Sequence, residues 1–189
     1  MRKVIIFNMV SLDGFFEGPS QEIDWHVVDE EFNQYAADQF NTIDTLLFGR
    51  TTYLLMAGYW PTPTAVDEDP LIAKLMNETA KIVFSRTLEN ADWQNTRLFK
   101  GDAVEEVGKL KKLPGRDMMI FGSGLLVSNL AQAGLIDEYR LMVNPVVLGS
   151  GNRLFRGIKE RLHLKLIDTQ SFRSGNVLLT YHPEKGESK

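Results

Sequence analysis

The chain has 189 residues, of which 43% are hydrophobic and 24% charged, and its formal net charge is −4. These values are typical of one globular domain with a full-sized core, and the negative balance argues against a protein that coats nucleic acid. The absence of cysteine excludes disulfides, thiolate metal ligands and a cysteine nucleophile, and it fits a reducing cytoplasm.

The apolar runs of the chain are short and rich in β-branched residues, which is typical of strands. The first run has only seven uncharged residues, 4–10, before the turn-like SLDG, which is too short for a signal peptide. No run approaches the roughly 18 apolar residues of a membrane span, so we expect a cytoplasmic protein. Strands are predicted at 3–10, 45–48, 81–84, 118–121, 138–143, 163–171 and 177–182.

Helical patterns lie between these strands. Phe32, Tyr35 and Phe40 fall on one helical face, and Asp102 stands where an N-cap is expected. A Pro-Gly pair at 114–115 and Gly134 stop two of the helices. The helical segments are 29–41, 67–79, 102–115 and 123–136.

The alternation of strands and helices predicts an α/β fold with a mostly parallel sheet, because parallel neighbours need a crossover connection. The last third differs, since two long strands flank RSGN, residues 173–176, a turn of hairpin type. The sheet should therefore end in an antiparallel C-terminal strand or hairpin. We predict a single domain over residues 1–183 and a flexible polar tail at 184–189.

Several chemistries find no support in the sequence. His26, His163 and His182 show no metal-ligand spacing, so no metal site is predicted. Neither a Walker pattern nor a complete G-x-G-x-x-G is present, and FGSGL, residues 121–125, lacks the first glycine of a nucleophile elbow.

Three predicted strands end in short polar or glycine-containing segments that lead toward a helix: FGRTTY (48–53), FSRT (84–87) and FGSG (121–124). In an open parallel sheet such segments converge at the carboxyl edge, where ligands bind. Helix starts offer free N–H groups to an anion, and the side chains of Arg50 and Arg86 add hydrogen-bond donors for a phosphate. Taken singly, each segment is equally consistent with an ordinary turn, and each arginine with a solvated surface charge. Together they predict a phosphate-binding site.

In this order the segments resemble the dihydrofolate reductase superfamily, and within it the reductase domain of bacterial riboflavin biosynthesis and its bacterial relatives. The resemblance implies a three-layer α/β/α fold. It also implies an NADPH-dependent reductase that transfers hydride to a small heteroaromatic, pterin- or pyrimidine-like substrate, as in folate or riboflavin metabolism. The segments that carry it are VSLDGFFEG (10–18), LLFGRTTY (46–53), KIVFSRTL (81–88), MIFGSGLLVSNLAQAGLIDEY (119–139) and NPVVLGSGNRLF (144–155).

The resemblance also implies a role for each cofactor-binding segment. Residues 50–52 would hold phosphate, Ser85 and Arg86 would contact the adenosine 2′-phosphate, and 122–125 would bind the pyrophosphate. The end of the first strand would meet the nicotinamide carboxamide, and residues 11–18 would cover the ring, with Gly14 and Gly18 as pivots. The implied cofactor-binding residues are Met9, Val10, Asp13, Gly14, Gly49, Arg50, Thr51, Thr52, Ser85, Arg86, Gly122, Ser123, Gly124 and Leu125.

The substrate side matches less well. Asp29 and Glu30 lie near the place where dihydrofolate reductases carry a carboxylate that helps to protonate the pterin, so both are catalytic candidates; Asp29 is equally a candidate helix N-cap. The basic residues that riboflavin-type reductases use for a ribose phosphate have no counterpart in this sequence. Neither dihydrofolate nor the riboflavin pyrimidine therefore follows as the substrate. Candidates for a substrate pocket, and equally for the core or an interface, are Trp25, Phe32, Tyr53 and Trp60.

Two functions from different classes follow: the reductase, and a non-catalytic dinucleotide- or ligand-binding module that keeps the fold without the proton donor. A purely structural domain would leave the three converging segments without a role. The segment 143–155 and the C-terminal hairpin are apolar for a sheet edge, which together with the resemblance predicts a homodimer. We expect a small-molecule substrate and neither nucleic acid nor membrane as a partner.

Overall fold

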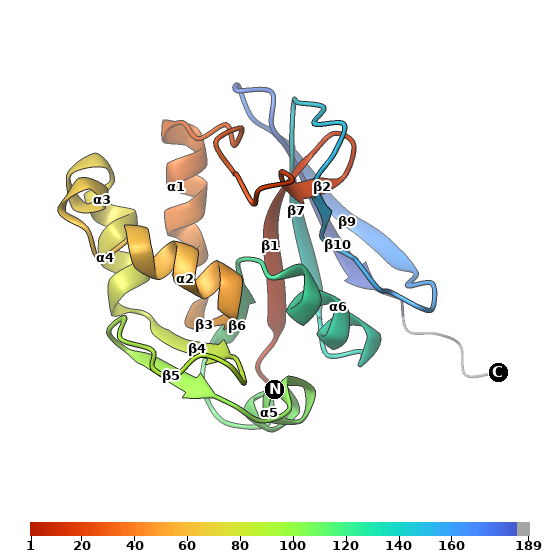
Figure 1. Ribbon diagram of the computed structural model, residues 1–189. Coiled ribbons are helices and arrows are strands. Elements are labelled where there is room, and N and C mark those ends of the chain that lie inside the picture. The colour runs from red at the N-terminus through yellow and green to blue at the C-terminus, as the bar shows by residue number, and fades with distance from the viewer. Residues whose placement is uncertain (185–189) are drawn as a thin grey trace.

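The structure, a computed structural model, describes residues 1–184 as ten strands and six helices (Figure 1). The strands are β1 (Val4–Ser11), β2 (Phe15–Glu17), β3 (Ile43–Gly49), β4 (Ala80–Phe84), β5 (Thr96–Phe99), β6 (Asp117–Ile120), β7 (Glu138–Asn144), β8 (Asn152–Arg153), β9 (Leu164–Ser171) and β10 (Val177–Pro183). The helices are α1 (Glu30–Gln39), α2 (Arg50–Tyr59), α3 (Pro63–Glu68), α4 (Pro70–Glu78), α5 (Ala103–Leu110) and α6 (Gly124–Gln132). None of these helices is long and apolar enough to span a membrane.

Eight of the strands form one sheet in the order β5-β4-β3-β6-β1-β7-β10-β9 (Figure 1). Every pair from β5 to β7 is parallel. β10 runs antiparallel to both β7 and β9, and the β9–β10 turn closes with a hydrogen bond from the Phe172 N–H to the Asn176 carbonyl. The predicted parallel sheet with an antiparallel C-terminal hairpin is confirmed.

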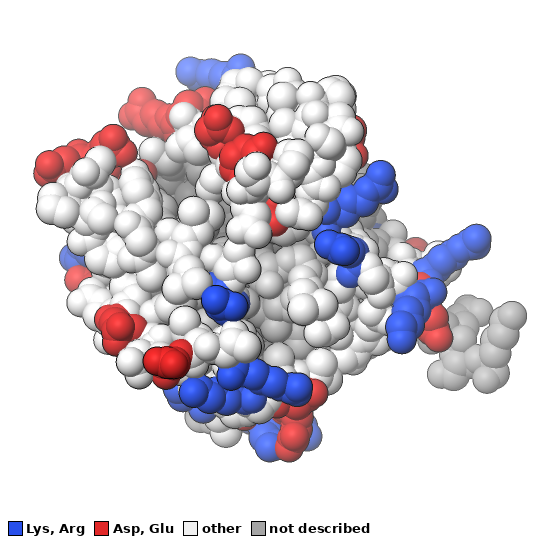
Figure 2. All heavy atoms as spheres, viewed as in Figure 1, with Lys and Arg blue, Asp and Glu red and all other residues white. Residues whose placement is uncertain are grey.

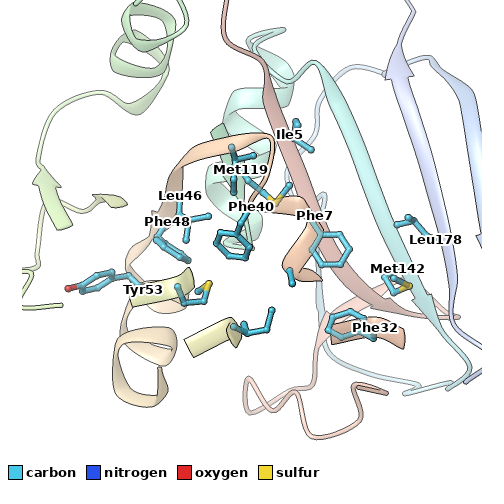
Figure 3. Close-up of a cluster of buried hydrophobic side chains, with 14 of the residues drawn as sticks. Ile5, Phe7, Phe32, Phe40, Leu46, Phe48, Tyr53, Met119, Met142 and Leu178 are labelled. Carbon is cyan, nitrogen blue, oxygen red and sulfur yellow. The ribbon is translucent and has the colours of Figure 1, made fainter. Parts of the chain in front are cut away.

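Helices cover both faces of this sheet because the central strands are apolar on both sides. On one face, α1, α2 and α4 pack on the cluster drawn in Figure 3, where Phe7 of β1 and Met142 of β7 meet Phe32 of α1. On the other face, α5 and α6 contribute Val107 and Leu130 to a second buried cluster. The helices therefore form the two outer layers of an α/β fold.

The predicted helices 29–41, 67–79, 102–115 and 123–136 correspond to α1, α4, α5 and α6, each shorter at its ends than predicted. The cap prediction is confirmed, since the Asp102 side chain accepts a hydrogen bond from the Glu105 N–H. The sequence missed α3 and the short strands β2, β5 and β8, and it gave no range for α2, although FGRTTY was predicted to lead toward a helix. The tail predicted at 184–189 lies, apart from Glu184, outside the described residues.

Candidate functional site

The three strand-end segments lie side by side at the carboxyl edge of the sheet, as predicted. β3 pairs in register with β4 and β6, and β6 pairs with β1. A Cβ placed on Gly49 would lie 2.5 Å from the Ser123 Cβ, and one placed on Gly122 would lie 3.3 Å from the Thr52 Oγ1. The start of α2 and the turn before α6 are therefore in direct contact (Figure 1).

The two helices that begin here differ from the others at their N-termini. In α1, α3, α4 and α5 a side chain accepts a hydrogen bond from a first-turn N–H; these caps are Asp29, Thr62, Asp69 and Asp102. The N-caps of α2 and α6, Gly49 and Ser123, make no such bond. Two sets of uncapped N–H groups, each at the positive end of a helix dipole, thus lie next to each other. This arrangement favours an anion.

The turn before α6 holds an unusual backbone conformation. Gly122 has φ +99° and Ser123 has φ +87°, and Ser123 is not a glycine. A left-handed conformation costs an ordinary residue about 1–2 kcal/mol. Such strain persists where the surrounding structure imposes it, which is common at ligand-binding turns.

A pocket of about 430 Å³ opens at the start of α2. Arg50, Thr51 and Thr52 line it together with Glu17, the last residue of β2, and Gln21 of the loop that follows. Three of the residues predicted to hold phosphate thus share one pocket with the loop predicted to cover the ring.

The basic residues of the site are free to meet a ligand. Arg50 and Arg86 are exposed, and neither forms an ion pair within residues 1–184. The Ser85 Oγ accepts hydrogen bonds from the Thr87 and Leu88 N–H groups, which turns the chain directly after β4. In Figure 2 most blue side chains lie along the lower and right margins and red ones gather toward the upper left. Attraction of an anion on this face therefore depends on local groups.

The loop predicted to cover the ring, residues 11–18, is tied to the segment after β7. The Asp13 carboxylate accepts hydrogen bonds from the Leu148 N–H (3.1 Å) and the Gly149 N–H (2.8 Å). A further bond from the Ser11 hydroxyl helps to hold the pKa of Asp13 below its usual range. β2 pairs with β8, and the Asn152 Nδ2 donates to the Glu17 Oε1 at 2.8 Å. Asp13, predicted to contact the cofactor, thus organises the loop.

The joined loops also pack on the start of α6. A Cβ on Gly124 would lie 3.0 Å from the Leu154 carbonyl oxygen and 3.2 Å from the Phe16 ring, so a larger residue here would have to push these neighbours aside. Leu125 is exposed beside it, and Gly14 has φ +87° in the open part of the loop. The remaining predicted cofactor residues, Met9 and Val10, end β1 at the same edge of the sheet.

Glu17 lies in the same pocket as the uncapped start of α2, and burial raises its pKa, against a lowering by the Asn152 hydrogen bond. Its ionised form repels an anion, whereas its protonated form does not. Because the pKa is raised, protonation begins above the usual glutamate range, and the affinity of the wild-type protein for a phosphate-bearing ligand should rise as the pH falls through it. We expect Glu17→Gln to strengthen binding of such a ligand at neutral pH by up to about fivefold, the effect of roughly 1 kcal/mol.

Calorimetric titration of both proteins with NADP⁺ as the probe ligand at about pH 7 and pH 5 checks this. The advantage of the variant should be smaller at the lower pH. If the affinity of both proteins changed equally between the two pH values, the pH dependence would come from protonation of the ligand phosphate and not from Glu17.

The candidate residues on the substrate side are dispersed. The Asp29 Oδ1 accepts a hydrogen bond from the Phe32 N–H at 2.8 Å, so Asp29 has the cap role that the sequence left open, and Glu30 is exposed in the same turn. Phe32 stacks on Phe7 in the core. Trp25 and Trp60 are half-buried.

Tyr53 is buried, and its hydroxyl accepts a hydrogen bond from the Trp93 N–H. With residues 90–94 it lines a second pocket of about 580 Å³ on the other side of α2. Within residues 1–184, the four predicted aromatic residues do not gather around either of these two pockets.

The sequence missed three residues at this edge. Asn8 interrupts the apolar run of β1, which is a readable signal, because a strand buried on both faces has little place for an amide. Glu17 and Gln21 carry no comparable signal, since the β2–β8 pairing that positions them joins segments far apart in the chain.

Comparison with known proteins agrees with this geometry. The chain is 41% identical over 182 residues to the Bacillus subtilis (strain 168) protein named "Uncharacterized protein YyaP", covering 96% of this chain and 95% of that protein. A solved structure of a putative riboflavin biosynthesis protein from Shewanella sp. PV-4 matches with a TM-score of 0.75 and 23% identity, over 97% of this chain and 99% of that one.

The dihydrofolate reductase of Enterococcus faecalis, solved in complex with NADP(H) and RAB-propyl, matches with a TM-score of 0.65 and 17% identity over 97% of both chains. At these identities the two structures show the fold, which is that of dihydrofolate reductase. The chain also matches the RibD C-terminal domain family over residues 2–178. It therefore belongs to the RibD C-terminal domain family.

Proposed function

We propose that the protein is an NADPH-dependent reductase that transfers hydride to a small pterin- or pyrimidine-like heteroaromatic substrate. The observation that carries this proposal is the pair of uncapped helix starts, α2 and α6, in contact at Gly49 and Ser123. Four other helices of the described chain have side-chain caps, so the two exceptions fall where a diphosphate would need free N–H groups.

The strand order supports a dinucleotide laid across the carboxyl edge. Ser85 and Arg86 follow β4, the uncapped helix starts follow β3 and β6, and Met9 and Val10 end β1, which is next to β6. Neighbouring strands lie about 4.8 Å apart, so an extended ligand would meet these groups in sequence: adenosine phosphate, diphosphate, nicotinamide half. The cofactor would supply the hydride; the chain would bind it and orient its ring.

Arg86 would select NADPH over NADH by pairing with the 2′-phosphate. Arg86→Ala is expected to raise the Kd for NADPH about tenfold, the loss of one partly exposed charge-assisted contact, and to leave the Kd for NADH unchanged. Fluorescence titration of the variant with both nucleotides measures the two effects. Equal losses for both would remove Arg86 from this role.

The second candidate function is a ligand-binding module without turnover. It is favoured by one observation, that the Asp29 carboxylate, a candidate proton donor, caps α1. Oxidation of NADPH measured with a panel of pterins and pyrimidines separates the two functions. Turnover with any of them supports the reductase, whereas tight NADPH binding without turnover across the panel supports the module.

The homodimer predicted from the sequence stays a prediction. β9 is an edge strand of the sheet, and Leu166 and Ile167 on it are each 48% exposed. An apolar free edge is a suitable place for a second copy to pair. Sedimentation velocity gives the oligomeric state.

A further inference from the structure

Asn8, in the middle of β1, is a buried amide without a partner. It is 6% exposed, and its Oδ1 makes no hydrogen bond within residues 1–184. The neighbouring residues on this face of the strand, Ile6 and Val10, are apolar and belong to the buried cluster under α6. A buried amide left unpaired costs about 1–3 kcal/mol, so its presence calls for a reason.

The side-chain amide of Asn8 is directed at Gly122, in the turn between β6 and α6. Its Nδ2 lies 3.4 Å from the point where a Cβ of Gly122 would stand, and the Thr52 Oγ1 lies 3.3 Å from the same point. Because Gly122 has no side chain, the amide is separated from the start of α6 by backbone alone. Rotation about the terminal torsion of the side chain exchanges its oxygen and nitrogen, so Asn8 can present either a donor or an acceptor.

We infer that Asn8 hydrogen-bonds a hydroxyl of the ribose between the diphosphate and the nicotinamide. The inference rests on the proposed function. β1 lies beyond β6 in the strand order, one strand past the uncapped helix starts, so Asn8 falls between the expected diphosphate and the expected ring. A ribose hydroxyl both donates and accepts, which matches an amide. The unpaired amide lowers the stability of the unliganded protein, and it gains a hydrogen-bond partner when the dinucleotide binds.

Asn8→Leu, which keeps the side-chain shape and removes the polar atoms, tests this with three probes. NADPH and 2′-phospho-ADP-ribose contain the ribose in question, whereas adenosine 2′,5′-bisphosphate lacks it. The variant is expected to bind the first two about tenfold more weakly and the third as wild type does. The unliganded variant should unfold about 2–4 °C higher than wild type.

Asn144→Leu is the matched control for the stability measurement. Asn144 is also buried, but its Oδ1 accepts from the Val27 N–H at 2.9 Å, so its replacement should lower the unfolding temperature. Unchanged binding of all three probes by Asn8→Leu, with wild type binding NADPH, overturns the role of Asn8 and leaves the proposed function standing. Loss of adenosine bisphosphate binding as well would show a general distortion and also overturn it. Failure of wild type to bind NADPH overturns both.

Discussion

Gly49→Ala is expected to raise the Kd for NADPH by about 100-fold or more. The added Cβ would overlap the Ser123 side chain, coming within 2.5 Å of its Cβ, a separation that real structures do not show. The start of α2 must then move away from the start of α6. A 100-fold loss corresponds to about 2.7 kcal/mol, which is the loss of one or two charge-assisted hydrogen bonds between the helix starts and the diphosphate. Fluorescence titration with NADPH measures it, and circular dichroism confirms that the variant is folded.

Two further variants separate this mechanism from a general effect of alanine. Gly58→Ala, in the same helix, meets no atom within 4 Å and should leave binding unchanged while stabilising the fold by about 0.5–1 kcal/mol. The double variant Gly49→Ala/Ser123→Gly removes the overlapping side chain and should recover most of the affinity. Normal NADPH affinity in Gly49→Ala would show that the contact of the two helix starts does not matter for binding.

Lys81→Met is expected to lower the free energy of unfolding by about 3 kcal/mol. Lys81 is 1% exposed, and its Nζ donates to the carbonyl oxygens of Met76 (2.8 Å), Asn77 (3.0 Å) and Thr79 (2.6 Å). It thereby satisfies the last carbonyls of α4 and places a positive charge at the negative end of that helix. The ammonium also lies 4.5 Å from the centre of the Trp93 ring.

Burial lowers the pKa of Lys81 to about 8, so at neutral pH the group is still mainly the ammonium with three N–H donors. Methionine keeps the apolar stem and leaves buried carbonyls without a donor. Urea denaturation near pH 7 measures the loss. Lys74→Met, at an exposed position of the same helix, should change stability by less than about 0.5 kcal/mol. Similar losses in both variants would contradict the capping role of Lys81.

The sequence predicts most of the sheet because its central strands are apolar on both faces and stand between segments of helical periodicity. The first strand, predicted at 3–10, is observed at Val4–Ser11, and the hairpin turn at 173–176 joins the last two strands. β2 and β8 escaped prediction because they are three and two residues long and their pairing joins positions that no local pattern connects. α3 escaped because six residues are too few for a periodic stripe, and its N-cap Thr62, followed by Pro63, was recognised only in the folded chain.

The candidate site, like the fold, was predictable only in part. Strand-end glycines and arginines are visible in the sequence, so the convergence of 48–53, 84–87 and 121–124 was predictable. The strain at Ser123 and the free amide of Asn8 were not, because both depend on contacts made only in the folded chain. For a related reason the sequence left open whether the aromatic candidates form a pocket or the core. Phe32 and Tyr53 are as suitable for one as for the other, and the fold places both in the core, with Tyr53 also lining a pocket.

Equilibrium titration of the wild-type protein with NADPH and NADH, followed through the fluorescence of its three tryptophans, is the most direct test of the central claim. Saturable binding of NADPH in the micromolar range, with NADH at least about tenfold weaker, is the predicted result. Absence of binding of either nucleotide at millimolar concentration would contradict it, and the uncapped starts of α2 and α6 would then need another ligand.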